Sequence, residues 1–413
     1  MKPLPNSYVF DLSKNPLAQK GSLYGAAQSV ILNADGFAHA KQTIMAWPGY
    51  AVTPLRNLAG VAKATGVANV FYKDESTRFN LGSFKPLGGA YAVSQCLSKE
   101  IAAHNNGISP DPADLLNGKF KNIVSDITVT AATDGNHGRS VAWGAQLFGC
   151  RCVIFIHETV TPGRETAIAS YGAEVRRNPG TYDDAVRSAQ ETAERDGWHV
   201  IPDTSDGSII EAPRNVMQGY TLMAAEAVEQ LSDGVRPSHT FLQAGVGGMA
   251  AATAAELWQT YGADRPKTVL VEPKTAACWY ESLLAQKPVV VDGELDSIMA
   301  GLACGEISKL AWEILAPCSD AMIKIDDEAA ADCMRLLAGS RYGDAPFAAG
   351  ESAVAGLAGF LAVANDVTAR AKVGLDAGSN VLLFGTEGAT DPDTYAEIVG
   401  YSASDVNLGE AVG

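Results

Sequence analysis

Short apolar runs alternate with longer stretches of mixed apolar and polar residues along most of the chain. The short runs have the length and the Val, Ile and Phe content of buried strands, and the longer stretches have the length of helices. Strands are predicted at residues 70–73, 122–132, 151–157, 173–177, 198–201, 239–242, 268–271 and 381–384. Helices are predicted at residues 84–100, 138–149, 183–195 and 249–261, and another begins at Thr161, Pro162 and Glu165.

The alternation of strands and helices predicts an α/β fold built from βαβ units, with parallel sheets that helices cover on both faces. In such sheets ligands bind beyond the carboxyl ends of the strands, so the loops at those ends are the first place to look for chemistry. No linker of Pro, Gly or Ser divides the chain, which favours one domain inserted into another. The polar segment 99–121 is predicted to be an excursion at the surface.

Composition narrows the class of protein. The chain has 413 residues, of which 47% are hydrophobic and 19% charged, and this excludes intrinsic disorder. Lys and Arg number 31 against 47 Asp and Glu, which gives a formal net charge of −16. Such an acidic chain is not expected to bind nucleic acid or an anionic membrane surface. Its charge favours a small molecule as the partner, and a cationic one in particular.

Several classes of site are disfavoured by residue spacing. The seven cysteines are scattered without a C-x-x-C pair, and no two of the six histidines stand beside a glutamate at zincin spacing, so no metal is expected. The longest apolar stretch, residues 353–364, is shorter than the ~20 residues of a membrane helix. The N-terminal residues lack the apolar run of a signal peptide, so the protein is predicted to be cytoplasmic.

The first candidate site follows the strand predicted at residues 70–73. A loop with Gly82 leads to Ser83, which is placed to cap the next helix, and Lys85 then falls in the first helical turn. The positive end of the helix dipole disfavours a cation there, so the pKa of Lys85 is expected to be lowered. This suits an amine that forms a Schiff base, although a first-turn lysine is more often a solvated surface residue.

The second candidate opens the helix predicted at residues 138–149. Backbone N–H groups beside Gly135 and Gly138 predict an anion site that a substrate carboxylate would fit. The charge of Asp134 would repel such an anion, and the alternative is that Asp134 only caps the helix.

Two further loops also follow predicted strands. Gly245, Val246, Gly247 and Gly248 form a loop that can cradle a phosphate, but residue 250 is not the glycine that the dinucleotide motif requires. Without a P-loop lysine, the phosphate is expected to belong to an organic cofactor. Thr386 offers a hydroxyl after the strand predicted at residues 381–384.

Taken together and in this order, the four loops resemble those of pyridoxal-phosphate enzymes of the tryptophan-synthase-β type (fold type II), and within that group those of the diaminopropionate ammonia-lyases. The resemblance runs from residue 50 onward. It is carried by residues 50–55, 73–76, 78–79, 84–92, 133–139, 217–220, 298–306, 350–352 and 386–388. It implies a two-domain fold with a large, discontinuous cofactor-anchoring domain, residues 1–95 and 206–413, and a small domain, residues 96–205. It also implies a homodimer.

The resemblance implies roles for single residues. Lys85 would form the Schiff base with pyridoxal 5′-phosphate, Phe84 would contact its ring, and Asn136 would donate to its O3′. The phosphate would bind to Gly245, Val246, Gly247 and Gly248, and the hydroxyl of Thr386 would face the pyridine nitrogen. The residues implied to contact the substrate are Ser83, Thr133, Asp134, Gly135 and His137.

Two carboxylates carry the expectation about the reaction. Dehydratases of this fold have serine where this chain has Asp134, and Asp203 matches a second carboxylate of the ammonia-lyases. Two bases on opposite faces of the substrate would allow both D and L isomers to react. The segment 204–213 departs from the family because it lacks its usual Trp and Tyr. Cys278 and Cys304 flank the expected entrance and are either paired or, as is usual in the cytoplasm, free.

The leading hypothesis is therefore a pyridoxal-phosphate-dependent lyase that converts 2,3-diaminopropionate to pyruvate and ammonia. The nearest alternative keeps the cofactor but eliminates hydroxyl from a β-hydroxy amino acid such as 3-hydroxyaspartate, serine or threonine. A metabolite-binding regulatory protein is a third possibility, but it leaves Lys85 and Asp134 unexplained.

Overall fold

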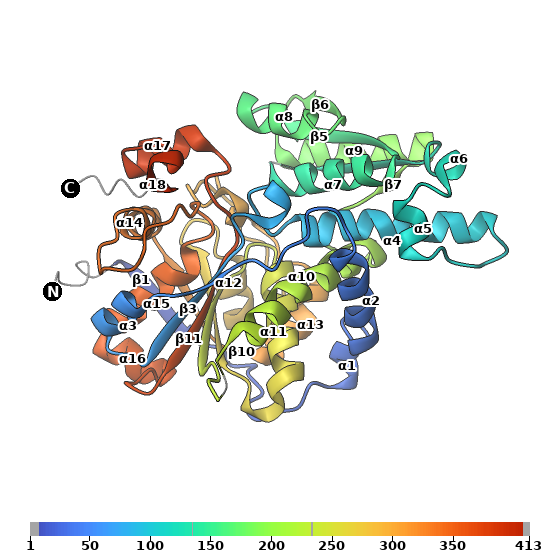
Figure 1. Ribbon diagram of the computed structural model, residues 1–413. Coiled ribbons are helices and arrows are strands. Elements are labelled where there is room, and N and C mark those ends of the chain that lie inside the picture. Colours follow the sequence, from blue (N-terminus) through green and yellow to red (C-terminus); the bar gives the residue numbers. More distant parts are fainter. Residues whose placement is uncertain (1–7, 134, 233, 408–413) are drawn as a thin grey trace. The chain divides into compact units, whose positions relative to one another are not determined.

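The computed structural model describes residues 8–133, 135–232 and 234–407. The chain forms two compact units (Figure 1). Unit 1 comprises Met1–Ile31, Val52–Thr77 and Met223–Gly413, and unit 2 comprises Leu32–Ala51 and Arg78–Leu222. These boundaries differ from the predicted domain division, which stays a prediction, because the helix after Lys85 packs within unit 2.

Unit 1 contains a seven-stranded sheet. In spatial order its strands are β1 (Phe10–Lys14), β10 (Ser319–Ile325), β9 (Lys267–Pro273), β8 (His239–Gln243), β11 (Asn380–Gly385), β3 (Asn69–Asp74) and β2 (Leu55–Asn57). The five strands from β10 to β3 are parallel, and β1 and β2 pair antiparallel at the two edges. The prediction of parallel sheets is therefore confirmed for the five central strands, and the two edge strands make the sheet a mixed one. Both edge strands are part-exposed and lack the continuous apolar run of a buried strand.

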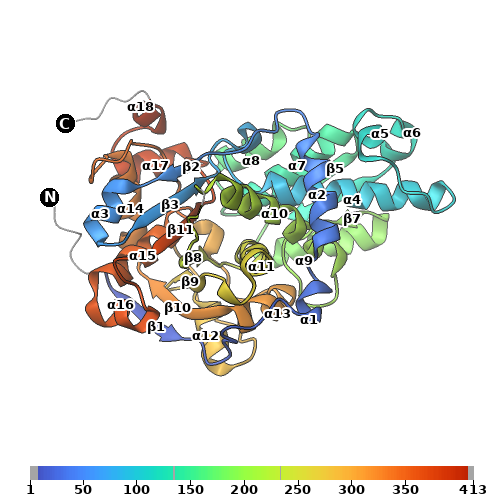
Figure 2. The ribbon, with the colours of Figure 1, turned by 60° about the horizontal axis from the view of Figure 1, so that its bottom comes forward.

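Helices cover both faces of this sheet, with α15 and α16 on one side and α11 and α13 on the other (Figures 1 and 2). The helices of unit 1 are α1 (Ala26–Ser29), α3 (Ala59–Thr65), α11 (Gly248–Tyr261), α12 (Cys278–Ala285), α13 (Lys309–Cys318), α14 (Asp327–Ala338), α15 (Ala355–Asn365), α16 (Val367–Val373), α17 (Pro392–Val399) and α18 (Ala403–Asn407). Short 3₁₀ turns lie at Gly262–Asp264 and Ala300–Leu302. The long apolar run becomes α15, which is apolar all round because it is buried in the core.

Unit 2 contains a four-stranded parallel sheet in the order β6 (Glu174–Asn178), β5 (Arg151–His157), β4 (Thr128–Ala132) and β7 (His199–Val200). Its helices are α2 (Ala34–Met45), α4 (Pro86–His104), α5 (Pro112–Leu116), α6 (Lys121–Val124), α7 (Asn136–Phe148), α8 (Pro162–Ala169) and α9 (Tyr182–Asp196), with a 3₁₀ turn at Arg78–Asn80. Helix α10 (Glu211–Gln230) begins in unit 2 and ends in unit 1.

One strand prediction in unit 2 needs correction. Residues 122–132 are not one strand, because α6 precedes β4 and only the β-branched and alanine residues of Thr128–Ala132 extend. In the segment 99–121, α4 continues to His104 and Asp111 caps α5, and most side chains are exposed or part-exposed, as predicted for an excursion at the surface. The predicted helix start at Thr161 is confirmed, because its hydroxyl accepts a hydrogen bond from the Arg164 N–H and Pro162 begins α8.

Small residues let the start of α4 pack closely against two other helices. A Cβ at Gly89 would clash with Ser140 Oγ on α7, and a Cβ at Gly219 on α10 would clash with the Leu87 carbonyl oxygen. Neither position therefore accommodates a larger residue without movement of the backbone. These contacts fix α4 two to four residues after Lys85.

A fully buried ion pair stabilises unit 1 at the end of β3. Lys73 Nζ lies 2.7 Å from Glu226 Oε2, with side-chain exposures of 0% and 2%. The ammonium also donates to the Thr53 carbonyl oxygen at 2.7 Å and to Gln230 Oε1 at 2.8 Å. These contacts join β3, the last turns of α10 and Thr53, which lies next to Val52, where the chain re-enters unit 1.

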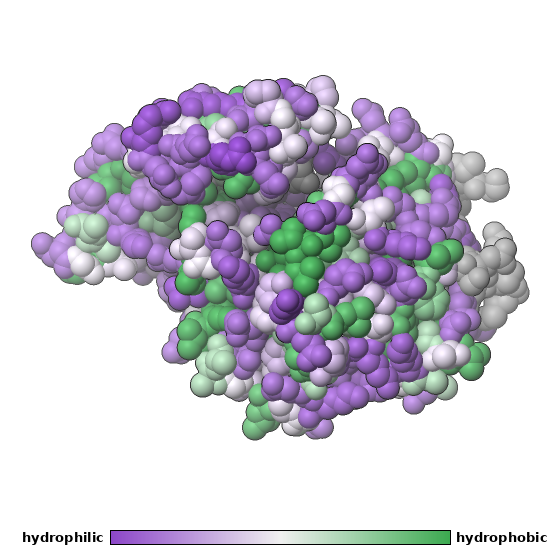
Figure 3. Space-filling view, turned by 180° about the vertical axis from the view of Figure 1, so that it is seen from behind, coloured by the Kyte–Doolittle hydropathy of each residue, from purple (hydrophilic) through white to green (hydrophobic). Residues whose placement is uncertain are grey.

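No helix among the described residues is long and apolar enough to cross a membrane. Hydrophilic side chains cover much of the face seen in Figure 3, with smaller hydrophobic areas between them. The charged side chains of this acidic chain therefore lie largely in water, as expected for residues that are not paired in the core.

Replacing Lys73 by Met is expected to lower the free energy of unfolding by about 3–5 kcal/mol, because Glu226 would remain buried without its partner. The double variant Lys73→Met with Glu226→Leu should be more stable than the single variant, since it removes both charges of the pair. Urea unfolding measures both. Lys119→Met, which breaks an exposed pair with Asp114, is the control and should cost less than about 1 kcal/mol. Equal losses in the single and double variants would contradict the interpretation.

Candidate functional site

The predicted site residues fall into two groups, one in each compact unit. Unit 2 holds those around Lys85, namely Ser83, Phe84, Lys85, Thr133, Gly135, Asn136, His137 and Asp203. Unit 1 holds Gly245, Val246, Gly247, Gly248 and Thr386. Asp134 lies outside the described residues.

Lys85 and Asp203 form the central contact of the unit 2 group. Lys85 Nζ donates a hydrogen bond to Asp203 Oδ2 at 2.7 Å, across 118 positions of sequence. The side chains are 23% and 18% exposed, so both are largely removed from water but still reachable. Lys85 is the N-cap residue of α4, and Asp203 follows β7 and Ile201, beyond the carboxyl end of the parallel sheet.

The predicted cap at Ser83 is wrong. No side chain caps α4, and Pro86 occupies its first turn, where its missing N–H leaves one group fewer to satisfy. Ser83 is buried instead, at 2% exposure.

His137 also approaches Asp203. Its Nε2 is 2.7 Å from the Ile201 carbonyl oxygen, which can only accept, so this nitrogen carries a proton. Its Nδ1 lies 3.9 Å from Asp203 Oδ2, the oxygen that accepts from Lys85. An amine and an imidazole therefore approach the same carboxylate oxygen.

These neighbours decide the charge of Asp203. Burial alone would raise the pKa of its carboxyl, but the positive charge of Lys85, followed by that of His137 and the hydrogen bond from Lys85, outweighs burial and holds the pKa well below its usual range. Asp203 is therefore a carboxylate at neutral pH while Lys85 carries its proton.

Thr133 occupies part of the backbone at the start of α7. The N–H groups of Gly135 and Gly138 donate to the buried Thr133 Oγ1 at 3.0 and 3.2 Å. The anion site predicted from the backbone N–H groups beside these glycines stays a prediction. Asn136 follows as the first residue of α7.

Two aromatic rings lie beside the Lys85 amine. The rings of Phe84 and Tyr220 lie 4.5 Å apart between centroids, and Lys85 Nζ is 5.5 Å and 6.0 Å from them. Burial raises the pKa of the Tyr220 phenol, so it stays protonated. Tyr220 has no role in the sequence prediction, although it belongs to a motif, residues 217–220, that matches the family.

The unit 1 group begins with the glycine loop, Gly245, Val246, Gly247 and Gly248, between β8 and α11. Gly245 and Gly247 have φ values of 55° and 101°, which favour glycine. No side chain caps α11. The loop therefore presents the N-terminus of a 14-residue helix at the carboxyl end of β8. Backbone N–H groups at such a helix start can stabilise a phosphate ester.

Thr386 lies beyond the adjacent strand, β11. Gln243 Nε2 donates to Thr386 Oγ1 at 3.1 Å and to the Phe384 carbonyl oxygen at 2.7 Å, and Gln243 and Thr386 are both buried. Because the Thr386 oxygen already accepts from Gln243, its own O–H can donate elsewhere. Sequence reasoning missed Gln243; the signal was a polar residue at the end of a wholly buried strand.

The remaining candidates are simpler. Cys278 and Cys304 form no disulfide bond in the part of the chain that the structure describes, and neither do the other five cysteines. Among the described residues, no group of three or more His, Cys, Asp or Glu could hold a metal.

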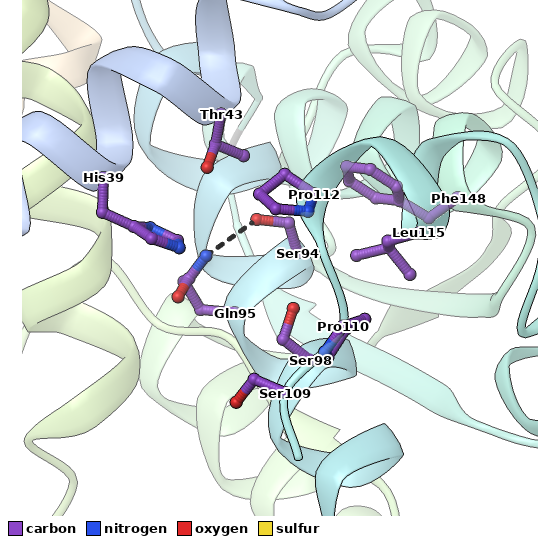
Figure 4. A pocket seen from close by; sticks show the side chains of 10 residues that line it. All are labelled: His39, Thr43, Ser94, Gln95, Ser98, Ser109, Pro110, Pro112, Leu115 and Phe148. Atoms are coloured by element: carbon purple, nitrogen blue, oxygen red, sulfur yellow. Dashed lines mark hydrogen bonds between the residues drawn. The ribbon is translucent and has the colours of Figure 1, made fainter. Parts of the chain in front are cut away.

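A small pocket in unit 2 is separate from all predicted site residues (Figure 4). It is lined by His39, Thr43, Ser94, Gln95, Ser98, Ser109, Pro110, Pro112, Leu115 and Phe148. Its lining offers hydroxyls and an amide but no lysine or arginine and no helix N-terminus like that of α11. The glycine loop is therefore the better phosphate site.

Each unit by itself offers groups that suit a part of pyridoxal phosphate. In unit 1 the uncapped glycine loop suits a phosphate and the Thr386 hydroxyl a ring nitrogen, and in unit 2 the Lys85 amine suits an aldehyde.

Comparison with known proteins points to the same cofactor. A family model described as "Pyridoxal-phosphate dependent enzyme" matches residues 46–377. The diaminopropionate ammonia-lyase of Salmonella typhimurium is 39% identical over 360 residues, which make up 85% of this chain and 89% of that protein.

Solved structures agree. Holo diaminopropionate ammonia-lyase from Escherichia coli superposes with a TM-score of 0.86 at 36% identity, covering 95% of this chain and 97% of that one. The same Escherichia coli protein in complex with D-serine gives a TM-score of 0.85 at 37% identity with the same coverage.

In the cofactor-free protein, Asp203→Asn is expected to lower the free energy of unfolding at pH 7 by about 1.5–3 kcal/mol, the worth of a hydrogen bond between charged groups. Because the folded-state pKa of Asp203 is below its unfolded value near 4, this contribution is present above about pH 4 and is lost as pH falls through the folded pKa. The difference between variant and wild type should therefore shrink at pH 3. Urea unfolding at both pH values measures it, with exposed Asp126→Asn as the control. An equal difference at pH 7 and pH 3 would count against the ion pair.

Proposed function

Because the chain belongs to the diaminopropionate ammonia-lyase family of pyridoxal-phosphate-dependent enzymes, we propose that it converts 2,3-diaminopropionate, as the D or L isomer or both, to pyruvate and ammonia. Loss of the β-amino group leaves 2-aminoacrylate, and water converts this to pyruvate and a second ammonia. The observation that carries the proposal is the Lys85 amine, held 2.7 Å from the Asp203 carboxylate at the start of α4.

Pyridoxal phosphate, when bound, supplies an electron-withdrawing ring that makes the Cα–H of an amino acid acidic. The protein's part is to position the substrate and to move protons. We assign Lys85 as the amine that would hold the cofactor through its aldehyde. Phe84 packs beside Lys85 and would lie against the ring, and Asn136 would donate to its O3′.

Asp203 is proposed as one of two bases for the Cα proton. Burial would raise the pKa of Asp203, but the positive charge of Lys85 outweighs burial and keeps the pKa low. The side chain is therefore an ionised carboxylate that could take the proton from Cα. Asp134 is proposed as the base for the opposite isomer.

The other residues bind and orient. The glycine loop would hold the phosphate through backbone N–H groups, and the Thr386 hydroxyl, which accepts from Gln243, would donate to the ring nitrogen. A neutral hydroxyl partner keeps that nitrogen less protonated, which favours elimination. His137, Thr133, Gly135 and Ser83 would contact the substrate.

The leading alternative is elimination of hydroxyl from a β-hydroxy amino acid. It is favoured by the D-serine complex of the Escherichia coli relative and by the departure of segment 204–213, which follows Asp203, from the family pattern. The excess of acidic residues favours the diamine, because its β-ammonium group is attracted to a protein with a net charge of −16.

Assembly and location form part of the proposal. We expect a homodimer from the resemblance alone, and we propose a cytoplasmic location.

Wild-type protein loaded with pyridoxal phosphate is expected to release keto acid and ammonia from 2,3-diaminopropionate, and Lys85→Ala is expected to lose both this activity and the visible absorbance of the bound cofactor. Coupled assays for pyruvate and ammonia, run beside serine, threonine and 3-hydroxyaspartate, measure the preference. Lys99→Ala, an exposed lysine on the same helix, is the control and should behave as wild type. Turnover of the hydroxy substrates alone would decide for the alternative, and full activity of Lys85→Ala would overturn both.

Asp203→Asn and Asp134→Asn are expected to lower kcat/KM selectively for opposite isomers of diaminopropionate, each by about 10²–10⁴-fold, the usual contribution of a general base. Stereopure substrates in the same coupled assay provide the comparison. An equal loss for both isomers in both variants would mean that the two carboxylates do not act on opposite faces.

A further inference from the structure

The conformation of the glycine loop depends on a buried tryptophan. Trp279 Nε1 donates to the Gly245 carbonyl oxygen at 3.0 Å. Its ring also lies directly beneath Gly247, where an added Cβ would clash with Cζ2 and come within 2.8 Å of Cε2. The Trp279 side chain thus holds Gly245 by a hydrogen bond and fills the space beside Gly247.

Trp279 is itself held by the end of strand β9. Glu272 Oε1 accepts from the Trp279 N–H at 2.9 Å, and Glu272 Oε2 accepts from the Tyr280 N–H at 2.8 Å. The carboxylate therefore does what an N-cap side chain does for α12, which has no side-chain cap of its own. Glu272 is 1% exposed. Its pKa is raised to about 7, because burial outweighs the lowering effect of these two N–H groups.

The arrangement is rigid. Trp279 is fully buried and stacks on Trp312, with 6.0 Å between ring centroids and 24° between planes. The Ser308 N–H donates to the Val246 carbonyl oxygen at 2.8 Å, so the loop is held from a second direction by the residue just before α13. All of these residues belong to unit 1, and α12 and α11 can be followed in Figure 2.

We infer that Trp279, oriented by Glu272, is a positioning residue that sets the conformation of the glycine loop and thereby the affinity of the enzyme for the cofactor phosphate. It touches the loop backbone rather than the cofactor. This inference rests on the proposed function, in which the loop binds that phosphate, and it extends the site to two residues that carry no role in the sequence motifs.

The reasoning is one of preorganisation. A loop with two residues at positive φ has many alternative conformations when it is not held, and backbone donors bind a phosphate well only when they converge before it arrives. The indole N–H removes the freedom of the Gly245 peptide, and the ring limits movement of Gly247. Loss of a neutral hydrogen bond of about 0.5–1.5 kcal/mol corresponds to about a 2- to 10-fold change in an equilibrium constant.

The test compares Trp279→Phe with Trp258→Phe. Trp258 is an equally buried tryptophan, and its Nε1 also donates to a backbone carbonyl oxygen, that of Ser22, at 2.8 Å. It lies ten residues along α11 from Gly248, about 15 Å from the loop. The two variants therefore lose the same chemical group, one beside the loop and one remote from it.

The dissociation constant for pyridoxal phosphate, measured by titration of the cofactor-free protein, is expected to rise about 3- to 10-fold in Trp279→Phe and to stay within about twofold of wild type in Trp258→Phe. The ³¹P resonance of bound cofactor should shift only in Trp279→Phe. Glu272→Gln, which keeps the side-chain shape, should shift the same resonance and serves as the second variant if Trp279→Phe does not fold.

Equal changes in Trp279→Phe and Trp258→Phe, or an unchanged ³¹P resonance in both Trp279→Phe and Glu272→Gln, would overturn the inference and leave the proposed function intact. Absence of saturable cofactor binding by the wild-type protein would overturn the proposed function itself, and the inference with it.

Discussion

The hydrogen-bonded ion pair of Lys85 and Asp203 is the interaction on which the proposed chemistry depends. It joins the start of α4 to the chain that follows β7, and it does so in a setting that is largely but not wholly removed from water. In the proposed reaction the amine must react with an aldehyde, so it needs to be held in place yet remain reachable. A carboxylate at 2.7 Å provides this, and the imidazole of His137 lies 3.9 Å from the same carboxylate oxygen.

The fold supplies the rigidity that this pair requires. Gly89 and Gly219 allow α4 to pack against α7 and α10 at distances that no larger residue permits, so the backbone just after Lys85 has little freedom. The His137 ring, which also approaches Asp203, is held by its hydrogen bond to the Ile201 carbonyl oxygen. In unit 1, the ion pair of Lys73 and Glu226 plays a comparable part at the end of β3.

Local patterns in the sequence predict much of this fold. The continuous Val, Ile and Phe run of residues 151–157 gives β5 with the same bounds, and the apolar strands at the centre of the larger sheet are predicted within a residue or two. The edge strands β1 and β2 escape prediction because they are short, part-exposed and partly polar. Strand β10 also has no prediction.

The candidate site is predicted less completely. The resemblance names Lys85 and Asp203 separately, but their contact spans 118 positions and follows only from the packing of α4 beside the small sheet. The hydrogen bonds from the Gly135 and Gly138 N–H groups to Thr133 also follow only from the folded loop. Gln243 and Trp279 act through the backbone and side chains of other site residues. A polar residue at the end of a buried strand was a signal for Gln243, whereas no local pattern distinguishes Trp279 from an ordinary core residue.

The most direct measurement is to reduce the purified, cofactor-loaded protein with borohydride, digest it and locate the modified residue by mass spectrometry. Reduction makes the link between a lysine and pyridoxal phosphate permanent. The account predicts a single pyridoxyl-phosphate group on the peptide that contains Lys85. A group on any other lysine, or none at all, would contradict it.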